Sequence, residues 1–377
     1  MRVLFLSRKS LFSAPGGDTT QILKTAEYLE NLGLKIDIST ELEPNLKDYD
    51  IVHVFNLMRG QEAYIQVLNA KKQGKPVSLS TIYGLYTEYE KKASGGIRQK
   101  LANLLSPYQM EYLKILARAI RNRELHKGSI QILLKGYYKV LKETCNMVDV
   151  FFPNSESEIQ RVINDFQLSN IKYIIVPNAV DLKIFDYHNV KVEKEIEEKF
   201  KDCILCVARI EGRKSQLNLV KAIKDLPYKL VLIGKPAPNH MKYYERVRKE
   251  AGNNVIFLGQ INHEKLAQYY KVAKVHALIS WMETPGLSSL EAAAMKCNLV
   301  ITKKGDTYDY FKDYAFYCEP DNVESIKKSI INAYNSPFNE ELFELVRKKY
   351  TWENTAKETL KGYELAIKLH KEKLKEN

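Results

Sequence analysis

The segment E-T-P-G-L-S-S-L-E-A-A-A at residues 283–294 carries two carboxylates, eight positions apart, on either side of a Pro-Gly turn. The alanines predict that a helix begins after the turn, so Glu283 precedes this helix and Glu291 lies within it. With Ser288 as N-cap, Glu291 would be the third helical residue of a capping box, which is a structural role that needs no ligand.

The start of the same helix could instead bind a polar ligand. The turn at Pro285 places three backbone amides at the free N-terminal end of the helix, those of Gly286, Leu287 and Ser288. Such amides attract an anion, and Glu283 could accept hydrogen bonds from hydroxyl donors. The sequence leaves the structural and the ligand-binding interpretations of this segment open.

A second candidate is the cationic stretch V-A-R-I-E-G-R-K-S-Q at residues 207–216. Arg209, Arg213 and Lys214 follow a predicted strand and precede a predicted helix. Cations at the carboxyl end of a strand could neutralise a diphosphate, where Arg offers a planar fork and Lys a point charge. A solvated basic loop is the alternative, and it is the commoner case for an isolated pair of cations.

Near the N-terminus, A-P-G-G-D at residues 14–18 is a glycine turn between a strand and a helix. Gly16 and Gly17 would let backbone amides approach an anion closely, although an ordinary strand-to-helix turn explains them as well. The turn is neither a G-x-G-x-x-G motif nor a phosphate-binding P-loop. We expect Asp18 to cap the helix, with Gln21 at its third position.

His53 belongs to the apolar run D-I-V-H-V-F, residues 50–55, and we expect it at a strand end where its ring could reach a crevice. A strand-end histidine without partners is more often structural. The charged turn D-Y-D at residues 48–50 only superficially resembles a metal motif. We therefore predict no metal site.

Apolar runs alternate with helical patterns twice along the chain, which predicts an α/β fold with two doubly wound, Rossmann-like domains. The predicted domains are 1–177 and 178–355, followed by a C-terminal helix, 356–377, that packs back towards the first domain. Open parallel sheets bind ligands at the carboxyl ends of their strands, so we expect a site in a cleft between the domains. The predicted strands are 3–7, 34–39, 50–55, 75–82, 148–153, 172–177, 203–208, 229–234, 254–259, 275–280 and 298–302.

The net charge of +12 is concentrated in a helical insert at about 88–145. Residues 91–142 hold twelve Lys and Arg against two acids, which gives 12 − 2 = +10. Amphipathic spacing within this basic insert favours docking on an anionic membrane or gripping of a lipid-diphosphate acceptor. Two helices packed on the sheet with solvated cations are the equal alternative.

Five scattered cysteines form no disulfide framework, which fits a reducing compartment. The apolar start is too short for a signal peptide, and no apolar run approaches the roughly 18 residues that span a bilayer. We therefore expect a cytoplasmic protein, with a peripheral position on the inner face of the cell membrane as an alternative.

Taken together, these segments resemble the retaining glycosyltransferases of family 4, the glycosyl transferases group 1, which have the GT-B fold. Residues 283–294 resemble the E-x7-E element of that family, and V-P-N-A-V-D resembles its P-N-G-V-D turn, with Ala179 where glycine is usual. Residues 207–223 resemble its strand–loop–helix with G-R-x-x-x-x-K-G. The glycine turn with the following helix resembles its N-terminal loop.

The resemblance implies a reaction in which a sugar leaves a nucleoside diphosphate and joins a hydroxyl acceptor with retained anomeric configuration. Arg209, Lys214 and Glu283 would be the catalytic residues, with the cations on the diphosphate and the carboxylate on the sugar hydroxyls. Glu291 would hold the ribose. The other donor-binding residues would be Gly16, Gly17, Arg213, Pro285, Gly286, Leu287 and Ser288.

The reaction as the family is understood needs no cofactor and no metal, because fixed cations and amides stabilise the departing diphosphate. The donor would be a UDP-linked or GDP-linked sugar. On the acceptor side the family often has a histidine in the loop where this chain reads S-T-I-Y-G-L-Y, and Tyr83 occupies that place. We assign His53 and Tyr83 to the acceptor side.

The expected setting is the assembly of a cell-surface polysaccharide or glycolipid, with a saccharide or lipid-linked acceptor. A nucleotide-sugar epimerase on the same fold is an alternative, but the sequence shows no convincing carboxylate–histidine set for it. A nucleic-acid-binding protein that uses the basic insert lacks a recognisable motif, so we expect no nucleic acid partner. An inactive homologous subunit is the remaining alternative.

Overall fold

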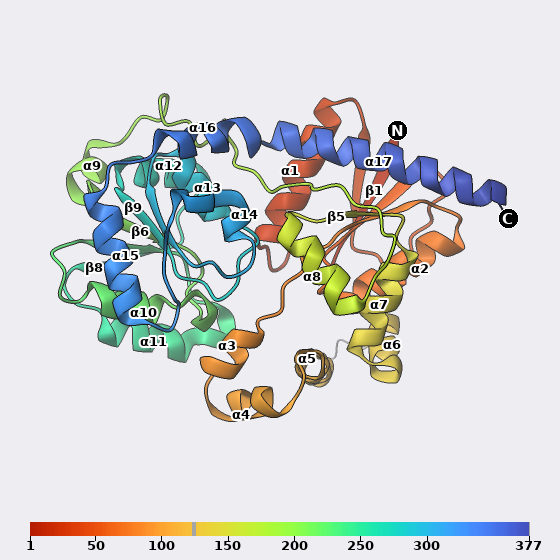
Figure 1. The fold of residues 1–377 in the computed structure, drawn as a ribbon, viewed down its shortest axis with the longest axis horizontal. Coiled ribbons are helices and arrows are strands. Elements are labelled where there is room, and N and C mark those ends of the chain that lie inside the picture. The colour runs from red at the N-terminus through yellow and green to blue at the C-terminus, as the bar shows by residue number, and fades with distance from the viewer. Residues whose placement is uncertain (123–125, 377) are drawn as a thin grey trace. The chain divides into compact units, whose positions relative to one another are not determined.

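The computed structural model describes residues 1–122 and 126–376, which fall into two compact units (Figure 1). Unit 1 holds Met1–Leu85, Lys100–Asn178 and the described residues from Trp352 on. Unit 2 holds Tyr86–Gln99 and Ala179–Thr351. Residues 123–125 of the basic insert lie outside the described residues.

Unit 1 is built on a five-stranded parallel sheet in the order β2-β1-β3-β4-β5. Strands β3 to β5 are buried along their whole length, because helices cover both faces of the sheet. The strands are β1 Arg2–Leu6, β2 Lys35–Ser39, β3 Ile51–Phe55, β4 Val77–Ser80 and β5 Val150–Phe152. The helices are α1 Gly17–Asn31, α2 Gly60–Lys72, α5 Pro107–Asn122, α6 Lys127–Lys135, α7 Tyr137–Met147, α8 Glu156–Phe166 and α17 Trp352–Glu376, with α4 Gly96–Leu104 leading in from unit 2.

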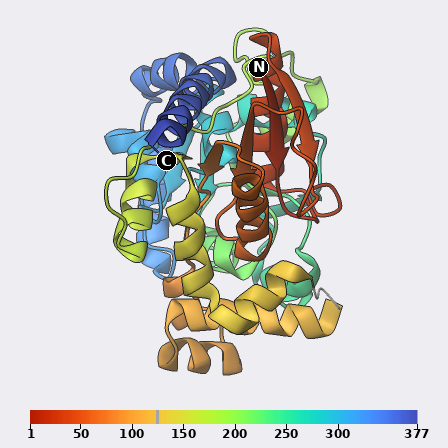
Figure 2. The ribbon, with the colours of Figure 1, turned by 90° about the vertical axis from the view of Figure 1, so that its right-hand side faces the viewer.

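The C-terminal helix α17 completes unit 1 and contacts α1, β4 and β5 (Figures 1 and 2). Its Gly362 lies against the ring of Phe152, where a Cβ atom would come within 2.1 Å of ring carbon Cε1. Its Tyr363 hydroxyl lies 2.7 Å from His53 Nδ1. The helix is therefore part of the core of unit 1.

Unit 2 contains a six-stranded parallel sheet in the order β11-β10-β9-β6-β7-β8. The central strands are mostly apolar and almost fully buried, as expected for strands covered on both faces. The strands are β6 Ile204–Val207, β7 Leu230–Ile233, β8 Val255–Gly259, β9 Val275–Leu278, β10 Asn298–Ile301 and β11 Phe316–Tyr317. The helices are α3 Thr87–Lys92, α9 Lys194–Phe200, α10 Gln216–Ile223, α11 Met241–Glu250, α12 His263–Val272, α13 Leu287–Ala294, α14 Thr307–Phe311, α15 Val323–Asn335 and α16 Glu340–Lys349, with 3-10 turns η1 Gly212–Lys214, η2 Pro238–His240 and η3 Lys312–Tyr314.

The prediction of two Rossmann-like domains is confirmed, while one predicted strand is wrong. Residues 172–177 form one isolated bridge, between Phe151 and Tyr173, and a further backbone hydrogen bond from the Val176 amide to the Pro153 carbonyl at 2.8 Å. The pairing does not continue as a ladder beyond Val176, because Pro177 lacks the amide that a ladder needs. Two further details differ from the predicted boundaries, since residues 86–99 belong to unit 2 and the chain returns to unit 1 at Trp352.

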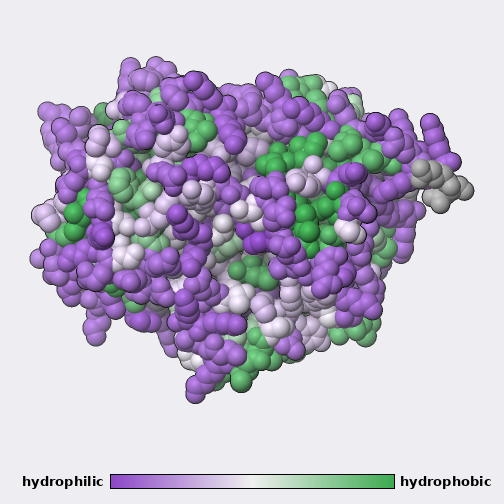
Figure 3. Space-filling model, viewed as in Figure 1, coloured by the Kyte–Doolittle hydropathy of each residue, from purple (hydrophilic) through white to green (hydrophobic). Residues whose placement is uncertain are grey.

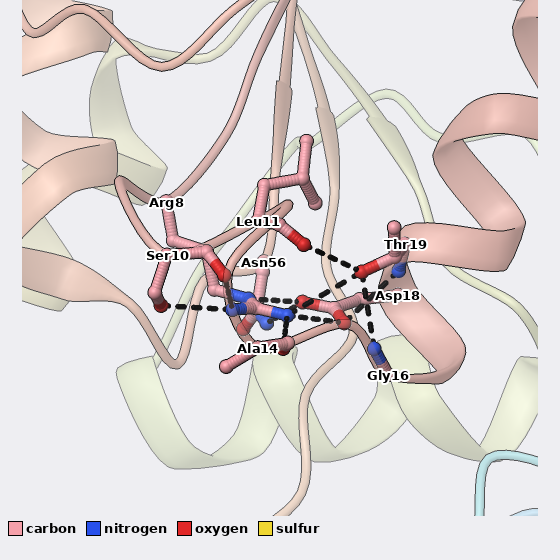
Figure 4. A network of polar contacts seen from close by, with 8 residues as sticks. All are labelled: Arg8, Ser10, Leu11, Ala14, Gly16, Asp18, Thr19 and Asn56. Atoms are coloured by element: carbon pink, nitrogen blue, oxygen red, sulfur yellow. Dashed lines mark hydrogen bonds and ion pairs between the residues drawn. The ribbon is translucent and has the colours of Figure 1, made fainter.

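The start of α1 is organised around Arg8 rather than a side-chain cap from Asp18 (Figure 4). Gly16 is the N-cap, and its amide donates to Thr19 Oγ1 at 3.1 Å. Asp18 instead receives two hydrogen bonds from the Arg8 guanidinium, at 2.6 and 3.0 Å. Burial would raise the pKa of Asp18, but Arg8 outweighs it and the pKa is lowered. The predicted capping role of Asp18 with Gln21 is therefore wrong.

Among the described residues no helix is long and apolar enough to cross a membrane. The five cysteines are all buried as free thiols.

Candidate active site

Two neighbouring strands of unit 2 bring a lysine and a glutamate together at their carboxyl ends. Lys214 ends the turn η1 that follows β6, and Glu283 lies in the loop that follows β9. The Lys214 ammonium contacts Glu283 Oε1 directly. Their side chains are only 16 and 11% exposed, so the pair lies mostly out of bulk water while one side stays accessible.

The backbone of Glu283 is fixed by the segment that follows β10. Its amide donates to the carbonyl of Lys304 at 3.2 Å, and its carbonyl accepts from the amide of Asp306 at 2.8 Å. Gly305 lies between these two bonds with φ of +85°. A Cβ atom there would stand 2.2 Å from the Glu283 carbonyl oxygen, so only glycine leaves room for Glu283 in this position.

The loop after β9 also holds the turn that carries the cations. The Trp281 amide donates to the Arg213 carbonyl at 3.0 Å, and Ser280 Oγ donates to the same oxygen at 3.3 Å. The two loops are thus bonded to each other through their backbones. The spacing of Lys214 and Glu283 follows from this connection as well as from their own ion pair.

Arg213 and Arg209 differ in how they are held. The Arg213 guanidinium donates to Glu211 Oε1 at 2.7 Å and lies over the ring of Tyr86, 4.7 Å from its centroid. Burial opposes its charge, yet Tyr86 and Glu211 together raise the pKa of Arg213. Arg209 is exposed and forms no ion pair within the described residues. It is therefore a cation available to an anionic ligand.

The N-terminus of α13 lies immediately after Glu283. Gly286, with φ of +91°, is the N-cap, and the helix begins at Leu287. The backbone hydrogen bonds of this first turn run from Ser289 and Leu290 to the Gly286 carbonyl. The amides of Gly286, Leu287 and Ser288 therefore remain at the open end of the helix, as the ligand-binding interpretation requires.

The capping box that the sequence suggested between Ser288 and Glu291 is wrong. Because the helix begins at Leu287, Glu291 is its fifth residue, two positions beyond the third-residue place of a capping box. One of its carboxylate oxygens lies 2.8 Å from His263 Nε2, and the other accepts from the Tyr270 hydroxyl at 3.1 Å. Glu291 is thus held by two side chains and is 12% exposed.

Segment 86–99 contributes residues that the sequence alone did not indicate. Besides Tyr86 under Arg213, Glu88 pairs with Lys304 at 2.9 Å, next to the bond that fixes Glu283. The Tyr89 ring packs 6.2 Å from the ring of Trp281. The aromatic residues of this otherwise charged segment could have indicated a packing role. The sequence could not identify the residues that they contact, because these lie more than 100 positions away.

In unit 1 the two residues assigned to the acceptor side are buried. His53 lies in the middle of β3 rather than at its end, and its ring nitrogens bond to Tyr363 and to Ser80 Oγ at 2.9 Å. Burial lowers its pKa well below the usual value, so His53 is a neutral core residue. Tyr83 follows β4 and donates to Asp165 Oδ2 at 2.6 Å.

Gly16 and Gly17 begin α1 at the carboxyl end of β1, and Gly17 is exposed. The structure thus places the glycine turn at the ligand-binding edge of its own sheet. Within residues 1–122 and 126–376 no three His, Cys, Asp or Glu side chains gather as a metal site would require. The expectation that no metal takes part stays a prediction.

Solved structures of other proteins show which fold class this chain has. Sucrose-phosphate synthase from Thermosynechococcus elongatus has a similar structure, with a TM-score of 0.71, 16% identity and 97 and 98% of the two chains covered. HepE from Anabaena, solved in complex with UDP and glucose, gives a TM-score of 0.59 at 12% identity, covering 100% of this chain and 98% of that chain. The predicted GT-B fold class is therefore confirmed.

The sequence comparisons point to the same class of protein. Residues 189–352 match the family model described as glycosyl transferases group 1. An uncharacterized glycosyltransferase from Methanocaldococcus jannaschii is 26% identical over 247 residues, which are 60% of this chain. The match covers 62% of that relative's length. The resemblance seen in the sequence motifs is confirmed.

We predict that Gly305→Ala lowers the rate of the reaction proposed below about a hundredfold, because the new methyl group would displace Glu283. Steady-state kinetics measure this effect. Gly33→Ala is the matched control, since Gly33 has a similar φ of +87° but no atom within 4 Å of the added Cβ. Equal rates for the two variants would show that the position of Glu283 does not matter.

We also predict that Tyr86→Leu raises KM for the donor of the reaction proposed below between about 2-fold and 30-fold, the range of a cation–π contact. The ring would no longer hold Arg213, while kcat would change little. Tyr86→Phe keeps the ring and should restore KM. A Phe variant as impaired as the Leu variant would contradict a role for the ring face.

Proposed function

We propose that this protein is a retaining glycosyltransferase, which moves a sugar from a nucleoside diphosphate to a hydroxyl acceptor. The observation that carries the proposal is the direct pair of Lys214 and Glu283 beside the open N-terminus of α13. Cations, amide donors and a carboxylate acceptor at one sheet edge suit a ligand with both a diphosphate and sugar hydroxyls. HepE, bound to UDP and glucose, supports a ligand of this kind.

The cations stabilise the departing group. When the bond between the anomeric carbon and the diphosphate oxygen breaks, both electrons of that bond stay on the diphosphate. Lys214 uses one of its three N–H donors on Glu283, which leaves two for phosphate oxygens. Arg209 and the α13 amides add further donors that are already in place, so little reorganisation is needed as the charge develops.

Glu283 positions the sugar. Its Oε1 faces Lys214, and its other oxygen can accept from a sugar hydroxyl. Because its backbone is fixed on both sides of Gly305, the carboxylate is held rather than free to rotate with a mobile loop. Glu291, oriented by His263 and Tyr270, is suited to accept from the two ribose hydroxyls in the same way.

Retention of configuration follows if the acceptor attacks from the face that the diphosphate leaves. The acceptor oxygen then forms the new bond to the anomeric carbon, and its proton passes to the departing phosphate oxygen. Glu283 is bonded to Lys214 and serves in sugar binding, so the pathway uses no carboxylate nucleophile. No step in this sequence requires a metal or a cofactor.

The donor nucleotide is UDP or GDP, and the acceptor is a saccharide or a lipid-linked saccharide. We place the reaction in the cytoplasm at the inner face of the cell membrane, in cell-surface polysaccharide or glycolipid assembly. Apolar side chains of α4, α5 and α6 support this setting, because Leu104, Ile120 and Leu134 are 81, 74 and 77% exposed. Apolar atoms are visible at the lower edge of Figure 3, by α4.

A panel of nucleotides and nucleotide sugars in a thermal-shift assay tests the function directly. A ligand present at a hundred times its Kd should stabilise the protein by about 2.7 kcal/mol. Two results together would support transfer. UDP or GDP should stabilise the protein, and the nucleotide sugar should release its nucleotide only when an acceptor is added. Conversion of the sugar without an acceptor would favour an epimerase, and a shifted nucleic acid band with no nucleotide binding would favour the nucleic-acid alternative.

We predict that Lys214→Ala and Glu283→Gln each lower kcat between about 100-fold and 1,000-fold, as loss of one fixed donor or acceptor does in other enzymes. Rates of nucleotide release measure the effect. Lys224→Ala is the control, because Lys224 is an exposed lysine at the end of α10 that pairs with Glu250 at 3.3 Å.

Circular dichroism must show that these variants keep the native fold, since each leaves a half-buried partner unpaired. A folded Lys214→Ala variant with wild-type turnover would refute the assignment of this site.

We predict that the protein sediments with anionic vesicles at low salt and is released at high salt. The double variant Leu104→Ser with Leu134→Ser should bind about fivefold or more weakly, because it removes apolar surface that would enter the bilayer interface. Leu374→Ser, at a 64% exposed leucine of α17, is the control. Absence of salt-sensitive binding by the wild type would remove the membrane proposal.

A further inference from the structure

A cavity of about 420 Å³ lies in unit 1, where the start of α5 meets the joint between α6 and α7. Four tyrosines and two lysines stand out among the residues that line it: Tyr108, Tyr112, Tyr137, Tyr138, Lys135 and Lys139. No carboxylate is among the described residues of its wall. The cavity is therefore aromatic with a positive rim, and the mechanism described above does not use it.

The local sequence explains why this wall is well defined. Ser106 caps α5, with Pro107 as the first helical residue and Gln109 as the third, so that Ser106 and Gln109 bond to each other's amides at 2.8 and 3.3 Å. The Tyr112 hydroxyl donates to the carbonyl of Leu133 at 3.3 Å, which ties α5 to α6. The tyrosines thus project from fixed helix ends rather than from a mobile loop.

The rings are also fixed from behind. Tyr108 and Tyr138 meet edge to face at 5.0 Å, and both pack against Phe166 of α8, at 6.0 and 5.6 Å. Packed aromatic rings of this kind present a flat face and a polar tip at a small entropic cost. A sugar ring, which has an apolar face and hydroxyls at its edge, matches that surface.

A chain of hydroxyls orients the polar tips. Tyr83 donates to Asp165 at 2.6 Å, so the Tyr108 hydroxyl, 3.0 Å away, must donate to Tyr83. The lone pairs of the Tyr108 oxygen are then left to accept from a ligand hydroxyl. Since Tyr83 follows β4 directly, this chain connects the cavity to the carboxyl edge of the unit 1 sheet.

The two lysines are not equivalent. Lys135 is neutralised by Glu143 at 2.7 Å and also donates to the Tyr64 hydroxyl at 2.8 Å. Lys139 is exposed and forms no ion pair within the described part of the chain. Glu143 lies near both lysines, so this one acid offsets only one of the two positive charges. The remaining positive charge beside an aromatic wall favours a ligand with a single anionic group over a neutral sugar.

We propose that this cavity binds a phosphorylated sugar of the acceptor, with the sugar ring on Tyr108 and Tyr138 and the phosphate at Lys139. The inference rests on the proposed function, because it names the acceptor of that reaction. The phosphate could belong to a soluble sugar phosphate or to the headgroup of a lipid. The exposed Leu134 next to Lys135 would accommodate the lipid chain in the second case.

Isothermal titration calorimetry of the full-length protein with glucose 1-phosphate, glucose and inorganic phosphate tests this site without any turnover. We expect glucose 1-phosphate to bind at least tenfold more tightly than either glucose or phosphate. Lys139→Ala and Tyr138→Ala should each weaken binding about tenfold, which is the loss of one charge-assisted or stacking contact. Lys142→Ala is the control, a lysine one turn along α7 that does not line the cavity.

A titration with UDP and GDP, which the proposed function assigns to unit 2, is run on the same samples. If the nucleotide binds and glucose 1-phosphate does not, the cavity proposal is overturned and the transferase proposal stands. The same conclusion follows if the nucleotide binds and the Lys139 and Tyr138 variants bind glucose 1-phosphate as tightly as the wild type does. Equal affinity for inorganic phosphate would also overturn it. Competition by vesicles that carry a phosphorylated glycolipid would support the site and identify a lipid headgroup, while binding of the soluble ligand alone would support the site with a free sugar phosphate.

Discussion

The ion pair between Lys214 and Glu283 is the constraint on which the chemistry of unit 2 depends. Two opposite charges that are 16 and 11% exposed gain little net stability from their attraction, because each has lost most of its hydration. The pair contributes mainly by fixing an ammonium and a carboxylate next to each other at the edge of the sheet. In the proposed reaction, a diphosphate would bind the first group and a sugar the second.

Much of the surrounding structure serves this one contact. Backbone bonds from Trp281 to Arg213 join the two loops, and Gly305 leaves room for the backbone of Glu283. Tyr86 and Glu211 hold the neighbouring Arg213, while Arg209 is left exposed for a ligand. The site therefore combines groups fixed in advance with one cation that can adapt, an arrangement suited to stabilising charge that develops during a reaction.

In unit 1 the corresponding polar side chains bond to other protein groups rather than being left for a ligand. Arg8 organises the glycine turn, His53 joins β3 to α17, and Tyr83 forms the end of a hydroxyl chain. The aromatic cavity and the exposed Lys139 on its rim remain accessible. A surface of rings and hydroxyls recognises shape and hydroxyl pattern, which suits the acceptor site that we propose for this cavity.

The sequence by itself determined the fold class, because apolar periodicity is a local pattern, and the E-x7-E, R-K and P-G-G segments predicted donor-side residues that stay a prediction. It could not decide between a capping role and a ligand role for Glu291, since that depends on a two-residue difference in the helix start and on His263, 28 positions away. It also misplaced His53 at a strand end, and it gave no sign that residues 86–99 pack beside Arg213. Only tertiary structure decides such contacts, because they join residues far apart in the chain and their energy exists only once both partners are buried together.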